Sequence, residues 1–143
     1  MKNKIPELSV FFPAYNEAGN IEEVIKQSLR ILPEIAKKFE IIIVNDGSTD
    51  ATKQISERLS KKHSRVRVVN QKNLGYGGAL KRGFKESKYE WIFFTDSDLQ
   101  FDLKELKKFV RFTKKYQMIL GYRKNRAEGL KRALLEPSSL RIS

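Results

Sequence analysis

Residues 91–100 read WIFFTDSDLQ, an apolar run of aromatic and β-branched side chains followed by two carboxylates. Such a run predicts a buried strand at 91–95, so the polar residues after it emerge at the strand's carboxyl end. Open α/β sheets bind their ligands at that end. Asp96 and Asp98, with the amide of Gln100 two residues further on, offer the oxygen ligands that suit Mg²⁺ or Mn²⁺. The alternative interpretation is an acidic turn that merely ends a strand.

Apolar runs and helical patterns alternate along the rest of the chain. Further strands are predicted at 8–12, 41–44, 66–69 and 118–120, and helices near 20–38, 50–62, 77–87 and 102–116. Asp50 is expected to cap the second helix, and Asn16 or Asn20 the first. Strands and helices that alternate in this way predict an α/β fold with a parallel sheet and right-handed crossovers.

Composition sets the broad class of protein. The 143 residues, 40% hydrophobic and 32% charged, are enough for one globular domain with helix faces in water. The absence of cysteine excludes disulfides and thiolate chemistry, and the single histidine, His63, lies in a polar run, which argues against histidine-centred hydrolase triads. No segment reaches the roughly 18 apolar residues of a membrane span, and residues 1–7 lack a signal-peptide core. A cytoplasmic location is therefore expected.

The formal net charge of +12 is large for a chain of this length. It favours partners such as polyanions, anionic lipid headgroups or phosphorylated substrates. The alternative is that basic residues only solvate helix faces, as the lysines of the predicted helix at 102–116 could do by themselves.

The segments after the first two strands carry polar groups suited to a nucleoside. Residues 13–20 read PAYNEAGN, in which the ring of Tyr15 could stack on a base and Glu17 could accept from a ribose hydroxyl or a base N–H. Residues 45–50 read NDGSTD, and Asp46 there is like the acidic nucleoside contact of nucleotide-binding sheets. Ordinary strand-to-helix turns with capping residues are the alternative for both segments.

The segment after the third strand is rich in glycine. Gly75, Gly77 and Gly78 precede a helix, which allows close backbone approach and turns N–H groups toward an anion. The dinucleotide-binding pattern does not match, because Leu80 stands where that pattern needs glycine. No Gly-Lys-Ser/Thr sequence occurs, so this is not a P-loop.

Taken in order, these segments resemble the family 2 glycosyltransferases, and most closely their polyprenyl-phosphate (dolichyl-phosphate) mannosyl- or glucosyltransferase branch. The resemblance runs from Leu8 to about Arg126, and Gln100 favours this branch. The segments that match the family are PAYNE at 13–17, VNDGSTD at 44–50, NLGYG at 73–77 with Ala79 and Gly83, DSDLQ at 96–100 and GYR at 121–123. The family implies a GT-A (Rossmann-like) three-layer α/β sandwich with a mainly parallel central sheet. A single nucleotide-sugar-binding domain is then expected over 1–143, incomplete at the C-terminus, with an atypical tail at 127–143.

The resemblance also implies the site and its ligands. The nucleotide would be held by Pro13, Tyr15, Glu17, Asp46, Gly75 and Asp96. Mg²⁺ or Mn²⁺ would be held by Asp96, Asp98 and Gln100. The catalytic residues would be Asp98 and Arg123, the arginine facing the phosphates, with Arg126 as a possible second. The implied partners are a nucleotide-diphosphate sugar of the GDP-mannose or UDP-glucose type and a lipid-phosphate acceptor at the cytosolic face of a membrane, with no nucleic acid.

Other functions stay open at the level of sequence. A family 2 transferase acting on a sugar hydroxyl would need a carboxylate base, for which no counterpart follows Glu128. A catalytically incomplete module would bind the nucleotide sugar only. A nucleic-acid binder fits the charge but not the aromatics, which lie mainly in strands. A phosphatase with Asp96 as nucleophile is disfavoured by Gln100, which stands where that pattern expects Thr or Val.

Overall fold

The computed structural model describes residues 4–110, 112–113, 118–120 and 133–135. Its main feature is a four-stranded sheet in the order β3-β2-β1-β4, in which every neighbouring pair is parallel. The strands are β1 (Ile5–Ala14), β2 (Ala36–Asp46), β3 (Val66–Gln71) and β4 (Trp91–Phe94). The helices are α1 (Ile21–Ile31), α2 (Thr52–Lys62), α3 (Gly75–Glu86) and α4 (Lys107–Val110), with 3₁₀ turns η1 (Leu32–Glu34) and η2 (Leu103–Leu106).

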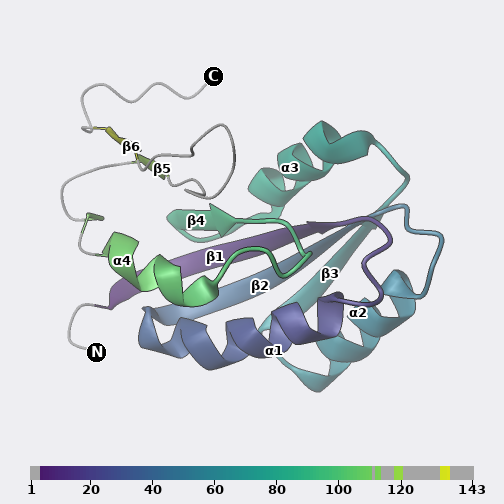
Figure 1. Cartoon of the computed structure of the whole chain (residues 1–143), viewed down its shortest axis with the longest axis horizontal. Helices are drawn as coiled ribbons and strands as arrows, with labels where there is room; N and C mark the ends of the chain where they lie inside the picture. Colours follow the sequence, from purple (N-terminus) through teal and green to yellow (C-terminus); the bar gives the residue numbers. More distant parts are fainter. Residues whose placement is uncertain (1–3, 111, 114–117, 121–132, 136–143) are drawn as a thin grey trace.

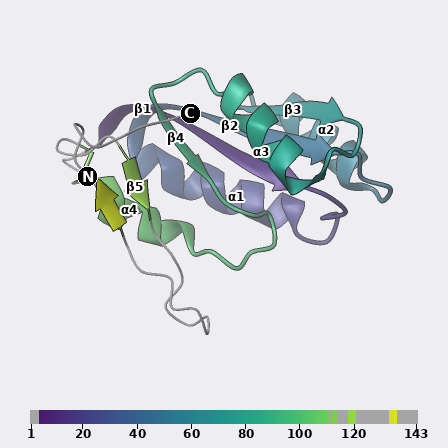
Figure 2. The same cartoon turned by 90° about the horizontal axis from the view of Figure 1, so that it is seen from above.

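Helices cover both faces of the sheet, which gives the three layers expected from the resemblance. Figure 1 shows α1, α2 and α4 on one side of the strands and α3 on the other, and Figure 2 shows α3 lying over the sheet. Two apolar clusters correspond to the two faces. The larger joins β1 and β2 to α1, α2 and the segment 103–110, whereas the smaller joins the sheet to α3. The predicted α/β class with a mainly parallel central sheet is confirmed.

The close approach of α3 to the sheet depends on one glycine. A Cβ at Gly83 would lie 2.2 Å from the ring of Phe11, so only a residue without a side chain fits there. Phe11 in turn stacks on Phe94 of β4 and meets Phe84 of α3 edge-on, with centroid separations of 5.2 Å in both pairs. These rings fix α3 against β1 and β4 and so fix the loop that precedes α3.

The predicted helix over 20–38 is wrong in its last part. The α-helix ends at Ile31, the turn η1 follows, and β2 already begins at Ala36. Pro33 lacks the N–H that would continue the helix. Ala36 then pairs with Ile5 at the start of β1, so both strands begin earlier than their apolar runs suggest.

The fifth predicted strand lies outside the parallel sheet. Met118–Leu120 (β5) pairs antiparallel with Ala133–Leu135 (β6), a strand that no apolar pattern in the sequence predicted. The predicted helix near 102–116 is reduced, within the described residues, to η2 and the single turn α4. A three-residue apolar run can pair in a parallel or in an antiparallel sheet. The pattern at 118–120 therefore does not specify which strand it pairs with.

The helix caps agree only in part with their prediction. Asp50 Oδ1 accepts a 2.9 Å bond from the N–H of Thr52, the first residue of α2, but the predicted cap is wrong by one residue, since Ala51 occupies the N-cap position and makes no side-chain capping bond. Asn20 occupies the N-cap position of α1, but its side chain makes no capping bond and instead donates to Glu17 Oε2. Within the part of the chain that the structure describes, no helix has the length and apolar content needed to cross a membrane.

Candidate functional site

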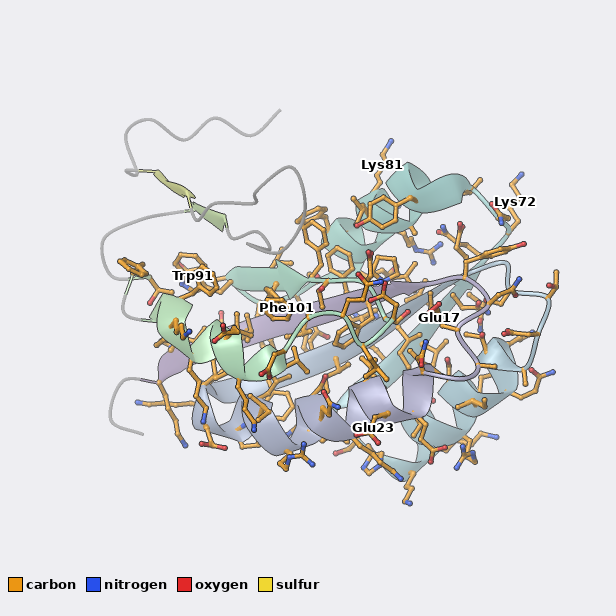
Figure 3. The ribbon with its side chains drawn as sticks, viewed as in Figure 1. Glu17, Glu23, Lys72, Lys81, Trp91 and Phe101 are labelled. Carbon is orange, nitrogen blue, oxygen red and sulfur yellow. The ribbon has the colours of Figure 1, made fainter. Side chains whose placement is uncertain are left out.

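A cleft of about 400 Å³ opens at the carboxyl ends of β1, β2 and β4. Parallel strands bring the loops that follow them to one edge of the sheet, which is where α/β proteins bind ligands. Figure 3 shows Glu17 at this edge, toward which the strand arrows point. We call this the donor cleft; its lining residues are Pro13, Ala14, Tyr15, Glu17, Asp46, Asn73, Gly75, Tyr76, Ala79, Asp96, Ser97 and Asp98.

Two loops are tied together to form one wall of the donor cleft. The side chain of Asn16, in the loop after β1, accepts a 2.8 Å bond from the N–H of Thr49 in the loop after β2. The N–H of Asn16 donates to Ser48 Oγ, and the N–H of Glu17 donates to Thr52 Oγ1 at 2.8 Å. Asn16 has a φ of 54°, a left-handed conformation that asparagine tolerates better than most residues. These bonds hold the backbone that carries Tyr15 and Glu17.

Asp46 connects the end of β2 to the loop before α3, the helix whose first turn holds Gly75, Gly77 and Gly78. Its side chain is buried, and Oδ1 accepts from Gln71 Nε2 at 2.9 Å and from the N–H of Leu74 at 2.8 Å. Among the described residues, no hydrogen bond reaches Oδ2, so this oxygen keeps its capacity to accept from a ligand. Gly47, with a φ of 70°, lies so close to the same loop that a Cβ would meet the Asn73 nitrogen at 2.5 Å.

The segment DSDLQ turns sharply after β4. Ser97 is buried and its hydroxyl donates to the carbonyl of Pro13 at 3.0 Å, which fixes the segment against the end of β1. Asp98 Oδ1 accepts from the N–H of Gln100 at 3.1 Å. Leu99 has a φ of 65°, and its side chain is exposed. Non-glycine residues in this conformation concentrate at ligand sites, because the surrounding structure must impose it.

The electrostatics of the donor cleft are strongly negative. Burial, and after it the charges of Asp98 and Asp96, raise the pKa of the Glu17 carboxyl, while a hydrogen bond from Asn20 acts in the opposite direction. Burial likewise raises the pKa of Tyr76, with the charge of Asp96 and a side-chain hydrogen bond to that carboxyl adding to the effect. These mutual effects show that the loops after β1 and β4 and the start of α3 converge.

The composition of the lining bears directly on what the cleft can bind. Among its described lining residues are four carboxylates and no lysine or arginine. A diphosphate would be repelled there unless a cation lay between. No three His, Cys, Asp or Glu side chains in the described ranges converge into a ready metal site. The residues present nevertheless fit Mg²⁺ or Mn²⁺, because such ions are often held by one or two carboxylates together with substrate phosphates.

Most of the site residues named from the sequence come together in this cleft. Those that line it are Pro13, Tyr15, Glu17, Asp46, Gly75, Asp96 and Asp98. Gln100 is exposed and is not among the lining residues, so its role as a third metal ligand stays a prediction. Arg123 and Arg126 lie outside the described residues.

Sequence reasoning assigned no role to Asn73, Tyr76 or Ser97, all of which line the cleft. An aromatic residue between two glycines at the start of a helix was the available signal for Tyr76. Ser97 left no signal, since its bond to Pro13 joins residues far apart in the sequence.

Comparison with known proteins places the chain in a family. Residues 9–135 match the profile of "Glycosyl transferase family 2". The chain is 36% identical over 107 residues to "Glycosyltransferase AglD" of Haloferax volcanii, covering 73% of this chain and 17% of that protein. It is 36% identical over 113 residues to "Dolichyl-phosphate beta-glucosyltransferase ALG5C" of Trichomonas vaginalis, covering 68% and 34% of the two chains.

A solved structure supports the same assignment. The mannosyltransferase PcManGT from Pyrobaculum calidifontis, in complex with GDP-Man and Mn²⁺, superposes with a TM-score of 0.64 at 25% identity, covering 77% of this chain and 32% of that one. The chain thus spans less than half the length of these relatives. Its fold is of the GT-A type, and the chain belongs to glycosyltransferase family 2.

Proposed function

We propose that the donor cleft of this family 2 chain binds a nucleotide-diphosphate sugar together with Mg²⁺ or Mn²⁺, and that the sugar is then transferred to an acceptor. One observation carries the proposal. A family 2 chain places four carboxylates and no cationic side chain, among the described lining residues, around the edge of the sheet where nucleotides bind. An anionic donor fits such a surface only with a divalent cation.

Asp96 and Asp98 are the proposed metal ligands, with Gln100 as a third. The bound metal would neutralise the charge that develops on the leaving diphosphate. Asp98 is held for this role by the bond from the Gln100 N–H, and the buried Ser97 fixes the turn between the two carboxylates. Tyr76 lies beside Asp96, whose charge helps to raise the pKa of that phenol, so Tyr76 is placed to orient this carboxyl.

The nucleoside is proposed to lie against the loops after β1 and β2. The exposed ring of Tyr15 offers a face for the base. Glu17 and the free Oδ2 of Asp46 accept from base N–H or ribose hydroxyl groups, and Pro13 closes the wall beside them. Gly75 brings backbone close to the phosphates without a side chain in the way.

The proposed reaction is an inverting transfer to a polyprenyl phosphate. An acceptor phosphate oxygen forms a bond to the anomeric carbon while the bond from that carbon to the nucleoside diphosphate breaks. An anionic phosphate needs no base for its deprotonation, so positioning and electrostatics suffice. The similarity to a dolichyl-phosphate glucosyltransferase supports this acceptor, and a membrane surface is where it would be met. Arg123 is the proposed phosphate contact.

Calorimetric titration of GDP and UDP tests the donor site. With Mn²⁺ present we expect one nucleotide to bind, and with EDTA its affinity should fall by at least tenfold, because the cleft then repels the diphosphate. Asp98→Asn keeps an acceptor for the Gln100 N–H but loses the charge, so it should abolish most of the metal effect.

Asp102→Asn is the matched control for that variant. Asp102 lies four residues further on, outside the lining, and its side chain accepts from the N–H of Lys104, which asparagine can replace. Equal nucleotide affinity with Mn²⁺ and with EDTA in the unmodified protein would overturn the proposal.

A further inference from the structure

A second cleft, of about 310 Å³, lies at the opposite end of the sheet. Its residues come from the first half of β2, from β3 and the loop before it, and from the loop before β4. Glu40 and Asp46 are six positions apart on β2, so the two clefts are about 20 Å apart at roughly 3.3 Å per residue. We call this the basic cleft; its lining residues are Lys38, Phe39, Glu40, Ser64, Arg65, Arg67, Lys88 and Tyr89.

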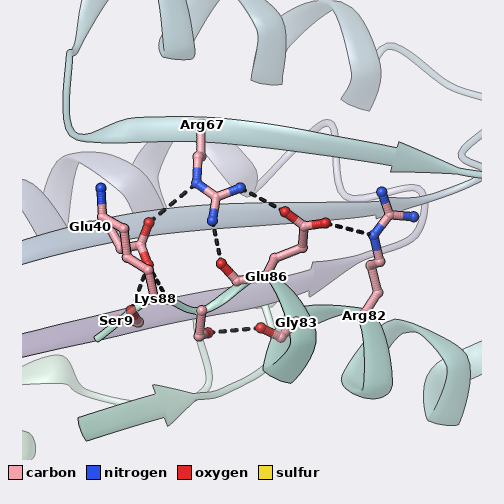
Figure 4. Close-up of polar contacts among 8 residues, drawn as sticks. Ser9, Glu40, Arg67, Arg82, Gly83, Glu86 and Lys88 are labelled. Carbon is pink, nitrogen blue, oxygen red and sulfur yellow. Dashed lines mark hydrogen bonds and ion pairs between the residues drawn. The ribbon is translucent and has the colours of Figure 1, made fainter. Parts of the chain in front are cut away.

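Glu40 is the only carboxylate in the described lining of the basic cleft, and both of its oxygens already accept hydrogen bonds. Glu40 is buried and accepts from Ser9 Oγ at 2.5 Å, from the N–H of Lys88 at 2.9 Å and from Arg67 Nε at 3.2 Å. Arg67 also contacts Glu86, which pairs with Arg82 (Figure 4). Glu40 and Arg67 therefore form a neutral, rigid floor.

The rim of the basic cleft, in contrast, carries charge without a partner. Lys38, Arg65 and Lys88 form no ion pair with any carboxylate of the described residues. Two of these cations rest on aromatic rings: Arg65 lies 4.5 Å from the ring centre of Phe39, and Lys88 lies 5.2 Å from that of Tyr89. An aromatic ring restrains a cation without neutralising it, so both side chains stay available to an anion.

We propose that the basic cleft binds a phosphoryl group, carried either by a membrane lipid or by a soluble phosphate compound. Three cations that pair with no described carboxylate, set around a neutral floor, match the negative charge of such a group. Arginine and lysine are the side chains that bind phosphate in proteins. This site is separate from the donor cleft and does not depend on the function proposed there.

Titration of the full chain with inorganic pyrophosphate in EDTA tests the site. EDTA keeps the anion out of the acidic donor cleft. Amide NMR signals of Arg65, Lys88 and Tyr89 should shift as pyrophosphate binds. The double variant Arg65→Gln/Lys88→Gln should weaken binding by about tenfold or more, because each lost cation removes a charge-assisted hydrogen bond.

The matched control is Lys53→Gln/Lys72→Gln, which removes the same charge. Both lysines are exposed, and Lys72 extends from the far end of the sheet (Figure 3). We expect the control to bind pyrophosphate with an affinity within about twofold of that of the unmodified chain, because the two lysines are distant from the basic cleft and screened by salt. An equal loss in both double variants would overturn the proposal, because it would show a diffuse effect of net charge.

Co-sedimentation with vesicles separates the two sources of the phosphoryl group. Phosphatidylcholine vesicles with and without phosphatidylglycerol are compared for the unmodified chain and for both double variants. If the protein sediments with the vesicles only when they contain phosphatidylglycerol, and only Arg65→Gln/Lys88→Gln loses this binding, the source is a lipid headgroup. Pyrophosphate binding without such retention identifies a soluble phosphate. If neither pyrophosphate nor these vesicles distinguish the two variants, the proposal is wrong.

Discussion

The two ends of the sheet differ in how they use a buried carboxylate. Asp46 and Glu40 lie on the same strand, β2, and are 4% and 5% exposed. Glu40, at the amino end, binds a hydroxyl, a guanidinium and a backbone N–H through both of its oxygens. Asp46, at the carboxyl end, binds Gln71 and the backbone of Leu74 through one oxygen only.

This difference separates a structural carboxylate from one suited to a ligand. An ion whose hydrogen-bonding capacity is filled by its own chain contributes to stability, because removing it leaves buried partners without a bond. An ion with a free oxygen facing a cleft contributes to binding. The charges around each end follow the same division: among the described residues, carboxylates without a cationic partner line the donor cleft, and three cations without a carboxylate partner line the basic cleft.

The largest effect is expected from Glu40→Ala. Loss of this side chain leaves Ser9 and the N–H of Lys88 without their acceptor and removes one partner of Arg67. The free energy of unfolding should fall by about 3–5 kcal/mol, because two donors lose their acceptor and a buried side chain is removed, whereas Arg67 keeps Glu86 as a partner. Urea denaturation measures it. Glu23→Ala, an exposed carboxylate on α1, should stay within about 0.5 kcal/mol. Similar stability for both variants would contradict a structural role for Glu40.

Gly47→Ala should damage the donor end alone. The new Cβ would lie 2.5 Å from the Asn73 nitrogen, at a φ of 70° that alanine rarely adopts. Strain and displacement of the loop should together cost about 2–4 kcal/mol of stability. Nucleotide affinity, measured by calorimetry, should fall as well, while pyrophosphate binding in EDTA should not. Gly19→Ala has nothing within 4 Å of its Cβ and is the control.

Asp46→Asn tests whether the free oxygen of Asp46 binds the nucleoside. Asparagine can still accept from Gln71 and Leu74, so the fold should persist, but its Nδ2 cannot replace Oδ2 as an acceptor. Nucleotide binding should weaken by about 1–3 kcal/mol, the cost of a mispaired polar group. The response to Mn²⁺ should remain. Loss of the metal response with unchanged nucleotide affinity would mean that Asp46 acts on the metal instead.

The smallest effect concerns the pH dependence of stability. The pKa of Glu17 is raised in the folded chain by burial and neighbouring carboxylates, so its contribution to stability falls as pH rises above its ordinary value of 4.5. The pKa of Glu86 is lowered by bonds from Arg67 and Arg82, so its contribution is present above 4.5 and is lost as pH falls through the lowered pKa.

Denaturation of Glu17→Gln and Glu86→Gln between about pH 3 and pH 7 compares the two carboxyls. Glu17→Gln should gain stability relative to the unmodified chain as pH rises, and Glu86→Gln should lose it. Each change should be less than about 1 kcal/mol, since both side chains keep contact with water. If the stability difference from the unmodified chain changed with pH in the same direction for both variants, the opposite environments of the two carboxyls would be contradicted.

Local patterns in the sequence determined the elements of this protein. Apolar runs and helical spacing predicted β1 to β4 and the three helices between them, because periodicity records which side of an element is buried. The same patterns placed Asp46, Asp96 and Asp98 at strand ends and so predicted where a ligand would bind. They failed at Ala36, where pairing with Ile5 favours a strand over continuation of a helical pattern.

Only the tertiary structure decided which groups are free to act. The sequence places Glu40 just before an apolar run but does not show that its carboxylate is fully hydrogen-bonded, because its partners Ser9, Arg67 and Lys88 come from three other parts of the chain. The same holds for Ser97, which is fixed by Pro13, and for β5, whose partner is β6. Hydrogen bonds and pairings between distant segments depend on how the whole chain packs. The sequence by itself therefore located the donor cleft, whereas the fold determined which carboxylates stabilise the protein and which face a ligand.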